Sequence, residues 1–225
     1  YGIYVSGDVG TTGVINNSGA ITAEIMTNTT YGDSAYGIYV SGDMNGQINN
    51  SGQIRTHFVD QDSASASQYG IYVSGGMTGG SITNSGSIQQ SYEGISSNEA
   101  YGIYVGSTMD GASITNSGLI AYNADTFWND VTFYGIYTSD LVNGSSILNS
   151  GTIRADVSIR GDYDASLYGI YTGSLTDSSV TNSGLIDLNV AATPGLSINT
   201  AYGIYVSGSL TNSQITNSGT ISLED

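Results

Sequence analysis

The sequence predicts an all-β fold, a parallel β-helix (β-solenoid) of about seven rungs of 32–35 residues. The element Tyr-Gly-Ile-Tyr occurs seven times, beginning at residues 1, 36, 69, 101, 134, 168 and 202. An Asn-Ser-Gly element follows 14 to 16 residues after the start of each copy. A fixed period in this range is typical of repeat proteins, whose length is set by copy number. We therefore expect residues 1–225 to form a single array.

The first strand of each rung is predicted from the Tyr-Gly-Ile-Tyr element itself. In the first copy, alternation places Tyr1, Ile3 and Val5 on one face and Gly2 and Tyr4 on the other. A period of two with β-branched and aromatic residues is typical of a strand. A glycine-rich corner follows, usually with an aliphatic residue just beyond it: Val9, Met44, Met77, Met109, Leu141, Leu175 and Leu210.

The second strand, Ile15–Asn17 in the first copy, places an asparagine on the same inward face as an isoleucine. Stacked rungs would then join these amides into an internal ladder, as in stacked cross-β chains. The predicted ladder consists of Asn17, Asn50, Asn84, Asn116, Asn149, Asn182 and Asn217. The glycine two residues later, Gly19 in the first copy, is expected to allow a bend through positive φ.

The third strand begins two residues after that glycine. Its first inward position is always isoleucine: Ile21, Ile54, Ile88, Ile120, Ile153, Ile186 and Ile221. Four residues later the position is again mostly apolar, for example Phe58 and Val157. The pattern is then lost for about nine to twelve residues, as in 60–68 and 191–201. This variable arm carries Phe127, Trp128, Tyr163 and Pro194, so we expect three strands and one arm per rung.

An alternative architecture for seven repeats is a seven-bladed propeller. Propeller blades usually take about 40–50 residues for four strands, whereas each repeat here has room for three strand-like segments. We therefore favour the solenoid. Stacking at about 4.8 Å would make Arg154 and Asp187 neighbours on one outward face, because each follows an invariant isoleucine by one residue.

The composition excludes several classes of partner. The chain has 19 acidic residues, three arginines and no lysine, which gives a net charge of −16. Nucleic acids and anionic membranes repel such a surface, because binding them requires basic residues. No segment approaches the roughly 20 apolar residues of a membrane helix, so we expect no membrane insertion. Because the sequence lacks an initiator Met and a signal peptide, we expect a processed product or an excerpt of a longer protein.

The chain's one histidine, His57, is the first candidate for chemistry. The predicted register places it in an outward column between Glu24 and Ser91, a combination found in hydrolases. Nothing in the sequence orders these residues as nucleophile, base and orienting acid. We therefore expect an exposed rung neighbour, no catalytic residue and no enzymatic activity.

Paired acids are the second candidate. The pairs Asp60/Asp62 and Asp162/Asp164 lie in the unpatterned arms, and no lysine is available as a base. Oxygen-rich loops of this kind can bind calcium, which is the one possible cofactor. However, the acidic residues at the glycine-rich corners do not occupy equivalent positions in the repeats: Asp8, Asp43, Asp110, Asp140 and Asp177. We therefore assign no metal site.

An outward column of tyrosines is the candidate interaction strip. It consists of Tyr4, Tyr39, Tyr72, Tyr104, Tyr137, Tyr171 and Tyr205. Stacked rings support one another by ~0.5–1.5 kcal/mol per pair, which favours a structural role. An exposed aromatic strip is also typical of surfaces that bind sugars or a neighbouring protein. We favour the structural role and keep binding as the alternative.

The elements Tyr-Gly-Ile-Tyr-Val-Ser-Gly at residues 1–7 and Thr-Asn-Ser-Gly-Thr-Ile at 216–221 closely resemble repeats in passenger regions of bacterial autotransporters and related surface adhesins. The resemblance covers the whole chain. It implies a right-handed parallel β-helix, exported to the cell surface through an outer-membrane barrel. No such barrel is present in this sequence, so the export route is only implied.

These features together predict a non-enzymatic, extracellular β-solenoid. It would form the repeating body of a surface fibre, stacking end to end with copies or further repeats of itself. The alternative is an adhesin that binds glycans or surface proteins through the variable arms or the tyrosine strip. Free solenoid ends need polar caps, and none is evident at Tyr1 or Asp225. This favours the fibre.

Overall fold

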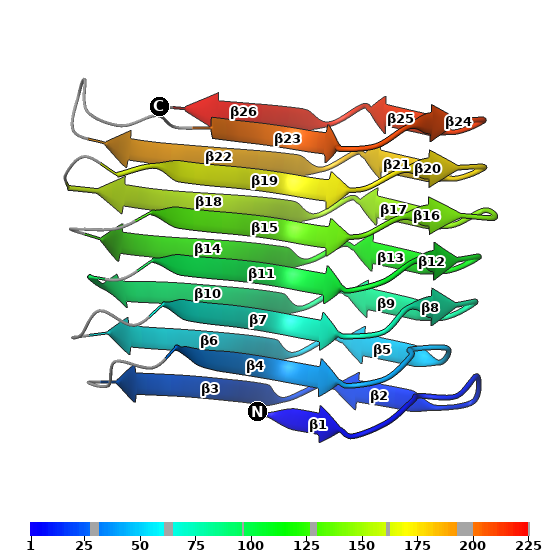
Figure 1. The fold of residues 1–225 in the computed structure, drawn as a ribbon, viewed down its shortest axis with the longest axis horizontal. Helices are drawn as coiled ribbons and strands as arrows, with labels where there is room; N and C mark the ends of the chain where they lie inside the picture. The colour runs from blue at the N-terminus through cyan, green and yellow to red at the C-terminus, as the bar shows by residue number, and fades with distance from the viewer. Residues whose placement is uncertain are drawn as a thin grey trace.

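The computed structural model describes residues 1–27, 32–60, 65–95, 97–126, 130–160, 163–192 and 200–224. These residues form 26 β-strands in four parallel sheets and no helix (Figure 1). Successive rungs stack along the solenoid axis, which is vertical in Figure 1, and the longest dimension of the molecule is horizontal. A single rung is therefore wider than the stack of seven is tall. The predicted parallel β-solenoid is confirmed.

One long sheet contains the Tyr-Gly-Ile-Tyr strands, and we call it the tyrosine sheet. Its strands are β1 (Ile3–Val5), β4 (Asp33–Val40), β7 (Ala66–Val73), β11 (Asn98–Val105), β15 (Val131–Thr138), β19 (Ala165–Thr172) and β23 (Thr200–Val206). The second long sheet begins each strand near an invariant isoleucine, and we call it the isoleucine sheet. Its strands are β3 (Ala20–Thr27), β6 (Gln53–Asp60), β10 (Ser87–Gly94), β14 (Leu119–Thr126), β18 (Thr152–Ile159), β22 (Leu185–Ala192) and β26 (Thr220–Glu224).

Two sheets of short strands close the other side of each rung. The asparagine sheet is made of β2 (Val14–Asn17), β5 (Gln47–Asn50), β9 (Ser81–Asn84), β13 (Ser113–Asn116), β17 (Ser146–Asn149), β21 (Ser179–Asn182) and β25 (Gln214–Asn217). The corner sheet is made of β8 (Met77–Thr78), β12 (Met109–Asp110), β16 (Leu141–Val142), β20 (Leu175–Thr176) and β24 (Leu210–Thr211). From the third rung on, each rung therefore contains four strands rather than the predicted three, because the aliphatic residue at the glycine-rich corner also pairs with its equivalents. In the first two rungs this pairing is the single bridge between Val9 and Met44.

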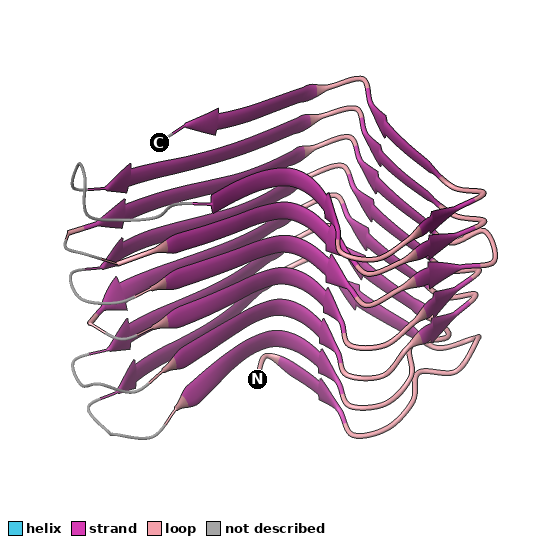
Figure 2. Cartoon of the chain, turned by 45° about the horizontal axis from the view of Figure 1, so that its top comes forward, coloured by secondary structure: helices cyan, strands magenta, loops and turns pink. Residues whose placement is uncertain are grey.

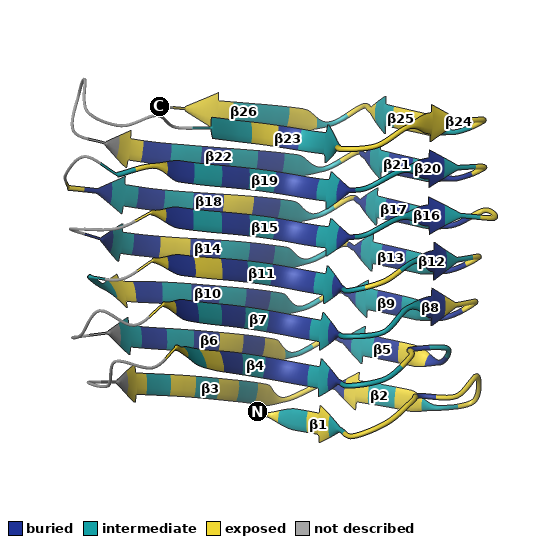
Figure 3. Ribbon diagram, viewed as in Figure 1, coloured by how far each residue is buried: buried dark blue, intermediate teal, exposed yellow. Residues whose placement is uncertain are grey.

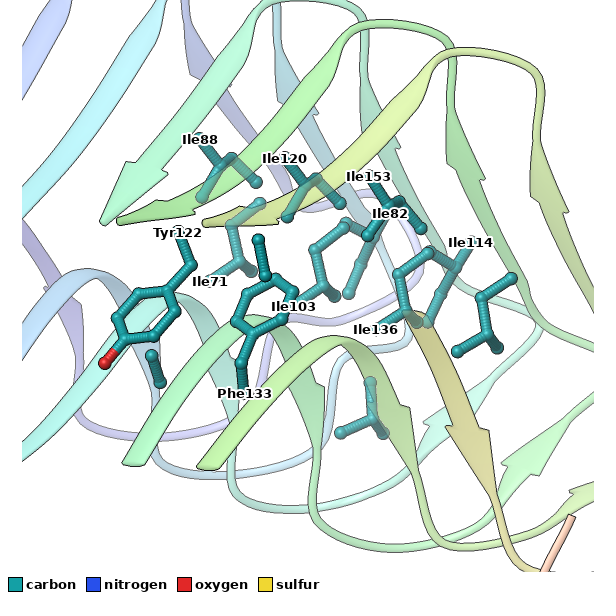
Figure 4. Packing of buried hydrophobic residues seen from close by; sticks show 14 of the residues in the cluster. Ile71, Ile82, Ile88, Ile103, Ile114, Ile120, Tyr122, Phe133, Ile136 and Ile153 are labelled. Atoms are coloured by element: carbon teal, nitrogen blue, oxygen red, sulfur yellow. The ribbon is translucent and has the colours of Figure 1, made fainter. Parts of the chain in front are cut away.

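Equivalent residues of successive repeats are paired throughout. Ile103 pairs with Ile136 in the tyrosine sheet, and Ile120 pairs with Ile153 in the isoleucine sheet. The invariant isoleucines thus form continuous columns, which are fully buried in the interior rungs (Figures 3 and 4). Tyr122 and Phe133 lie beside the isoleucines in this core and stack with ring centroids 5.3 Å apart (Figure 4). Shape-complementary columns of this kind make each rung depend on its neighbours for burial.

The predicted neighbours Arg154 and Asp187 are paired in register on strands β18 and β22. The ion pair of Arg154, however, is formed with Asp156 on its own strand, with Nε 2.6 Å from Oδ2. Asp156 lies two positions along the same strand and so projects from the same face. The predicted register is confirmed.

The variable arms are shorter than the sequence pattern indicates. Strand β6 extends to Asp60 and β7 begins at Ala66, so both ends of the supposedly unpatterned stretch 60–68 are strand. Likewise β22 extends to Ala192 and β23 begins at Thr200. Tyr163 packs against the hydrophobic core. Phe127, Trp128 and Pro194 lie outside the described residues.

The predicted inward position of Tyr1 and its equivalents is wrong. In β4, Tyr36 and Tyr39 are both half-buried on the outer surface, whereas Ala35, Ile38 and Val40 are buried. The alternation is interrupted at Gly37, where the long strands of this sheet bend (Figure 2). A Cβ at Gly37 would overlap Ile54 of the isoleucine sheet. Glycine therefore lets the two long sheets approach closely, and the bend turns both tyrosines outward.

The glycine of the Asn-Ser-Gly element is also required for close approach, and not for the predicted positive φ. In the described residues, positive φ among glycines occurs at Gly79, Gly111 and Gly144. Gly118 is typical of the Asn-Ser-Gly position: a Cβ there would overlap the carbonyl oxygen of Gly86 in the preceding rung. The backbones of successive rungs are thus packed too closely for any side chain at this corner.

Candidate functional site

Two columns of tyrosines run along the outer surface of the tyrosine sheet. We call Tyr1, Tyr36, Tyr69, Tyr101, Tyr134, Tyr168 and Tyr202 the first tyrosine column. The predicted strip, Tyr4, Tyr39, Tyr72, Tyr104, Tyr137, Tyr171 and Tyr205, is the second tyrosine column. Both columns together are the tyrosine face. The sequence reading missed the first column because it assumed unbroken alternation across the glycine.

The rings of the tyrosine face cover one another. In the interior rungs, neighbours within a column are 4.8–5.0 Å apart and within 8° of parallel. The two tyrosines of one rung meet edge to face, 4.7–5.5 Å apart at 79–88°. Both geometries are favourable aromatic contacts. The ring faces are therefore occupied by other tyrosines, and mainly ring edges and hydroxyl groups meet the solvent.

Burial within this double column makes the phenols hard to ionise. Desolvation, reinforced by neighbouring tyrosines, raises the pKa of Tyr72 and of Tyr134 to about 12. The pKa of Tyr101 is raised further, first by burial and then by the Glu99 carboxylate. The Tyr101 hydroxyl donates a hydrogen bond to Glu99 Oε2 over 3.2 Å. The stacked arrangement therefore favours the neutral, protonated form of these phenols.

We expect the protein to unfold in alkali together with tyrosine ionisation. An unfolded tyrosine titrates near pH 10, whereas Tyr72 and Tyr134 titrate near 12 in the fold. The unfolded chain loses these protons first, so the stabilisation is complete below pH 10 and is lost as the pH rises towards 12. Absorbance at 295 nm and far-ultraviolet circular dichroism should change together above pH 10. Titration of all tyrosines near pH 10 with intact sheet structure would contradict the stacked face.

The asparagines form one continuous hydrogen-bonded chain inside the solenoid. Each side-chain Nδ2 donates to Oδ1 of the asparagine in the following rung over 2.7 Å, from Asn17 to Asn217. Asn116 Nδ2 also approaches the carbonyl oxygen of Thr152 at 3.3 Å. The backbone carbonyl oxygen of Asn116 accepts hydrogen bonds from the backbone N–H groups of Ser150 and Gly151. The amides are buried except near the C-terminal end. They therefore satisfy both one another and the corner backbone.

His57 lies between Glu24 and Ser91 in the isoleucine sheet, as the register predicts. It is half-buried rather than fully exposed, because its Nδ1 lies 2.7 Å from Ser91 Oγ. Strand β10, which carries Ser91, is paired on both sides. Its backbone N–H groups are used by the parallel ladders, which leaves none pointing at a reacting carbonyl beside Ser91.

The acid pairs Asp60/Asp62 and Asp162/Asp164 are described only in part. Asp62 and Asp162 lie outside the described residues. The backbone N–H of Asp164 donates to Asp130 Oδ1 over 2.9 Å. Among residues with described placement, no three histidine or acidic side chains gather to hold a metal ion. Corner acids instead bind backbone amides of the next rung, as Asp43 Oδ1 does with Gly76 N–H at 2.9 Å.

A buried polar cluster near the arm end of the core escaped the sequence reading. Tyr122 donates to Asn98 Oδ1 over 2.7 Å, and Thr56 donates to Gln68 Oε1 over 3.1 Å. Gln90 Nε2 donates to the carbonyl oxygens of Gln68 and Tyr101. Other copies of the repeat indicate that this position is inward, because the residue before the Tyr-Gly-Ile-Tyr element is apolar in them: Ala35, Ala100, Phe133, Leu167 and Ala201. Gln68 occupies the same inward position.

The two end rungs differ from the interior in exposure (Figure 3). In the described chain, the exposed large hydrophobic side chains all lie in the first and last rungs: Tyr1, Tyr4, Val14, Met26, Tyr202, Leu210, Ile215 and Leu223. Leu210, Ile215 and Leu223 face inward, and their partners in the preceding rung are fully buried: Leu175, Val180 and Leu188. Val14 and Met26 lie on the outer surface, where equivalents in some other rungs are also exposed. The ends of the stack are therefore apolar cross-sections of the same core.

The described chain has no helix long and apolar enough to span a membrane. Comparison with protein-family models, with curated proteins and with solved structures finds no match for the chain. The relation to autotransporter passengers therefore remains a resemblance in the Tyr-Gly-Ile-Tyr and Thr-Asn-Ser-Gly elements.

Proposed function

We propose that this chain is a non-enzymatic structural segment of an extracellular fibre, extended by stacking further rungs on its ends. The added rungs belong either to further repeats of the same chain or to a second copy. The cell-surface location is part of the proposal and is supported by the autotransporter-like motifs. The observation that carries the stacking is the concentration of exposed apolar side chains in the end rungs.

The end rungs are complementary to each other in detail. At the N-terminal end, the Asn17 side chain donates to Asn50, and within the described chain its own Oδ1 receives no donor. At the C-terminal end, Asn217 Nδ2 meets the carbonyl oxygen of Gly219 at 3.4 Å and has no following asparagine. A last rung placed on a first rung would let Asn217 donate to Asn17. The junction would be heterologous and open, the type that produces filaments.

Unpaired strand edges add to this complementarity. Strands β1 and β23 are the outer members of the tyrosine sheet, and β3 and β26 are those of the isoleucine sheet. Edge strands present free N–H and C=O groups that template further strand pairing. Tyr202 and Tyr205 would stack on Tyr1 and Tyr4 and extend both columns. Every column of the array would then continue across the junction.

The tyrosine face supports the adhesin alternative less well. Sugars stack on the faces of aromatic rings, and in the interior rungs these faces are occupied by neighbouring tyrosines. The second binding element of that alternative, the variable arm, falls largely outside the described residues. A structural role for the tyrosine face agrees better with its geometry.

A charge at one end should stop elongation. Ile3→Asp places a carboxylate on the apolar cross-section of the first rung, where Ile3 packs against the core. Burying it in a junction would be unfavourable by several kcal/mol unless it is neutralised. We expect sedimentation velocity to show large assemblies for the unmodified chain and single chains for Ile3→Asp at the same concentration.

The matched control is Thr132→Asp, which adds the same charge on the outer surface of β15 in mid-array. It should assemble as the unmodified chain does. Equal assembly of the Ile3→Asp and Thr132→Asp chains would contradict end-to-end stacking, provided both retain the circular dichroism of the folded sheet.

A further inference from the structure

A hollow lies on the outer surface of the isoleucine sheet, away from both ends and from the tyrosine face. One part, of about 690 Å³, is lined by Arg55, His57, Ser91, Glu93, Asn123 and Asp125, among others. A second part, of about 410 Å³, shares Arg55, Ser91 and Asn123 and reaches Arg154. The two parts form one depression across strands β6, β10, β14 and β18.

Differences between repeats create this depression. The column one residue after the invariant isoleucine reads Arg55, Gln89, Ala121 and Arg154. The next outward column contains His57, Ser91 and Asn123 at the same levels. The small side chains of Ser91 and Ala121 therefore form a floor between two arginines. Three rung spacings, roughly 14 Å, separate the arginine backbones.

Two of the chain's three arginines and its histidine line the hollow, together with the carboxylates of Glu93, Asp125 and Asp156. All three arginines and the histidine of this chain lie on or beside the isoleucine sheet. Arg154 is paired with Asp156 at 2.6 Å, and Arg160 with Asp125 at 2.8 Å. Arg55 makes no ion pair with a carboxylate of the described chain. It is exposed at the rim of the hollow and offers a planar pair of donors for one carboxylate.

We propose that this hollow binds an oligosaccharide carrying a single carboxylate, with Arg55 holding the carboxylate. Gln89, Ser91 and Asn123 supply amide and hydroxyl groups for the sugar hydroxyls. A net charge of −16 repels polyanions, and Glu93 in the lining adds to this repulsion. One exposed, unpaired arginine matches one carboxylate. The site does not depend on end-to-end stacking and adds a ligand to the proposed fibre.

The probe is 3′-sialyllactose, and the control ligands, which lack the charged carboxylate, are lactose and the sialyllactose methyl ester. Titration followed by protein NMR should show saturable shifts around Ser91 and Asn123 with sialyllactose alone. Arg55→Gln should weaken binding about tenfold or more, because a charged hydrogen-bonded pair is lost. Ala121→Gln should abolish binding, because the longer side chain fills the floor of the hollow. The variant should still fold, because the new glutamine would stack on Gln89 of the neighbouring strand.

Ser166→Gln on the outer surface of β19 is the matched control and should bind as the unmodified chain does. Equal binding of lactose, binding that survives Ala121→Gln, or no saturable binding would each overturn the proposal. Heparin competing at the same residues would overturn the restriction to one carboxylate. The Ile3→Asp chain, which is expected to stay unassembled, allows the titration to fail or succeed independently of fibre formation.

Discussion

Gly118→Ala is expected to destabilise the solenoid by ~3 kcal/mol or more, since overpacking a tightly packed site typically costs 1–3 kcal/mol and occasionally more. The added Cβ would overlap the carbonyl oxygen of Gly86 and lie 2.7 Å from the carbonyl carbon of Ser85. These are backbone atoms of the preceding rung, held by the N–H of Gly118, which bonds the carbonyl of Asn84 at 3.1 Å. They cannot move aside without breaking the ladder. Thermal or denaturant unfolding measures the effect.

The matched control is Gly19→Ala, at the equivalent corner of the first rung. No atom lies within 4 Å of a Cβ built at Gly19, because no described rung precedes it. This variant should therefore be close to neutral in the unfolding of the isolated chain. Similar loss of stability in both variants would show that the glycine serves backbone conformation rather than close approach. In an assembled fibre the Gly19 variant should also impair the junction.

Asn116→Leu is the second large expected effect. Removing this amide leaves Asn84 Nδ2 without its 2.7 Å acceptor and Asn149 Oδ1 without its donor. Each unsatisfied buried group costs ~1–3 kcal/mol, so the loss for the two groups should be about 2–6 kcal/mol. Asn84 Nδ2 keeps its hydrogen bond to the Leu119 carbonyl oxygen at 3.1 Å, so the cost at Asn84 should lie at the lower end of the range for one group. Urea unfolding of the variant measures the loss.

The control for the ladder is Asn217→Leu in the last rung. Asn217 is exposed, and its removal deprives Asn182 alone of a partner. The loss should be less than half of that at Asn116. If the two variants unfold at the same denaturant concentration, the ladder does not stabilise the array in the way its geometry implies.

The repeat period, the isoleucine columns and the vertical alignment of the asparagines could be predicted from the sequence. Each is repeated in every copy, so a false alignment would have to recur seven times. Ile120 and Asn116 also lie on strands whose alternation is unbroken. The predicted strip from Tyr4 to Tyr205 is on the outer surface because the alternation holds on the C-terminal side of the glycine, as in Ile38, Tyr39 and Val40.

The position of Tyr36 could not be predicted, because it depends on a bend at Gly37. Alternation alone places a residue two before Ile38 inward, and only the contact between Gly37 and Ile54 reveals why the strand turns. The extent of the arms was overestimated because inward positions there vary among copies, as with Gln68 against Phe133. A polar residue in one copy hides a core position that other copies show.

The hollow could not be predicted for the opposite reason. It depends on differences in side-chain size between repeats, with Ser91 and Ala121 small and Arg55 and Arg154 long. A reading based on what the repeats share discards such differences. Outward positions in a solenoid carry this information, because stacking fixes their neighbours while leaving their identity free.

Electron cryomicroscopy of the unmodified chain is the most direct measurement of end-to-end stacking. The expected result is filaments in which the roughly 4.8 Å rung spacing continues across every junction, with the asparagine and tyrosine columns unbroken between Asn217 and Asn17 and between Tyr202 and Tyr1. Discrete particles with both end rungs covered by segments of their own chain would contradict it.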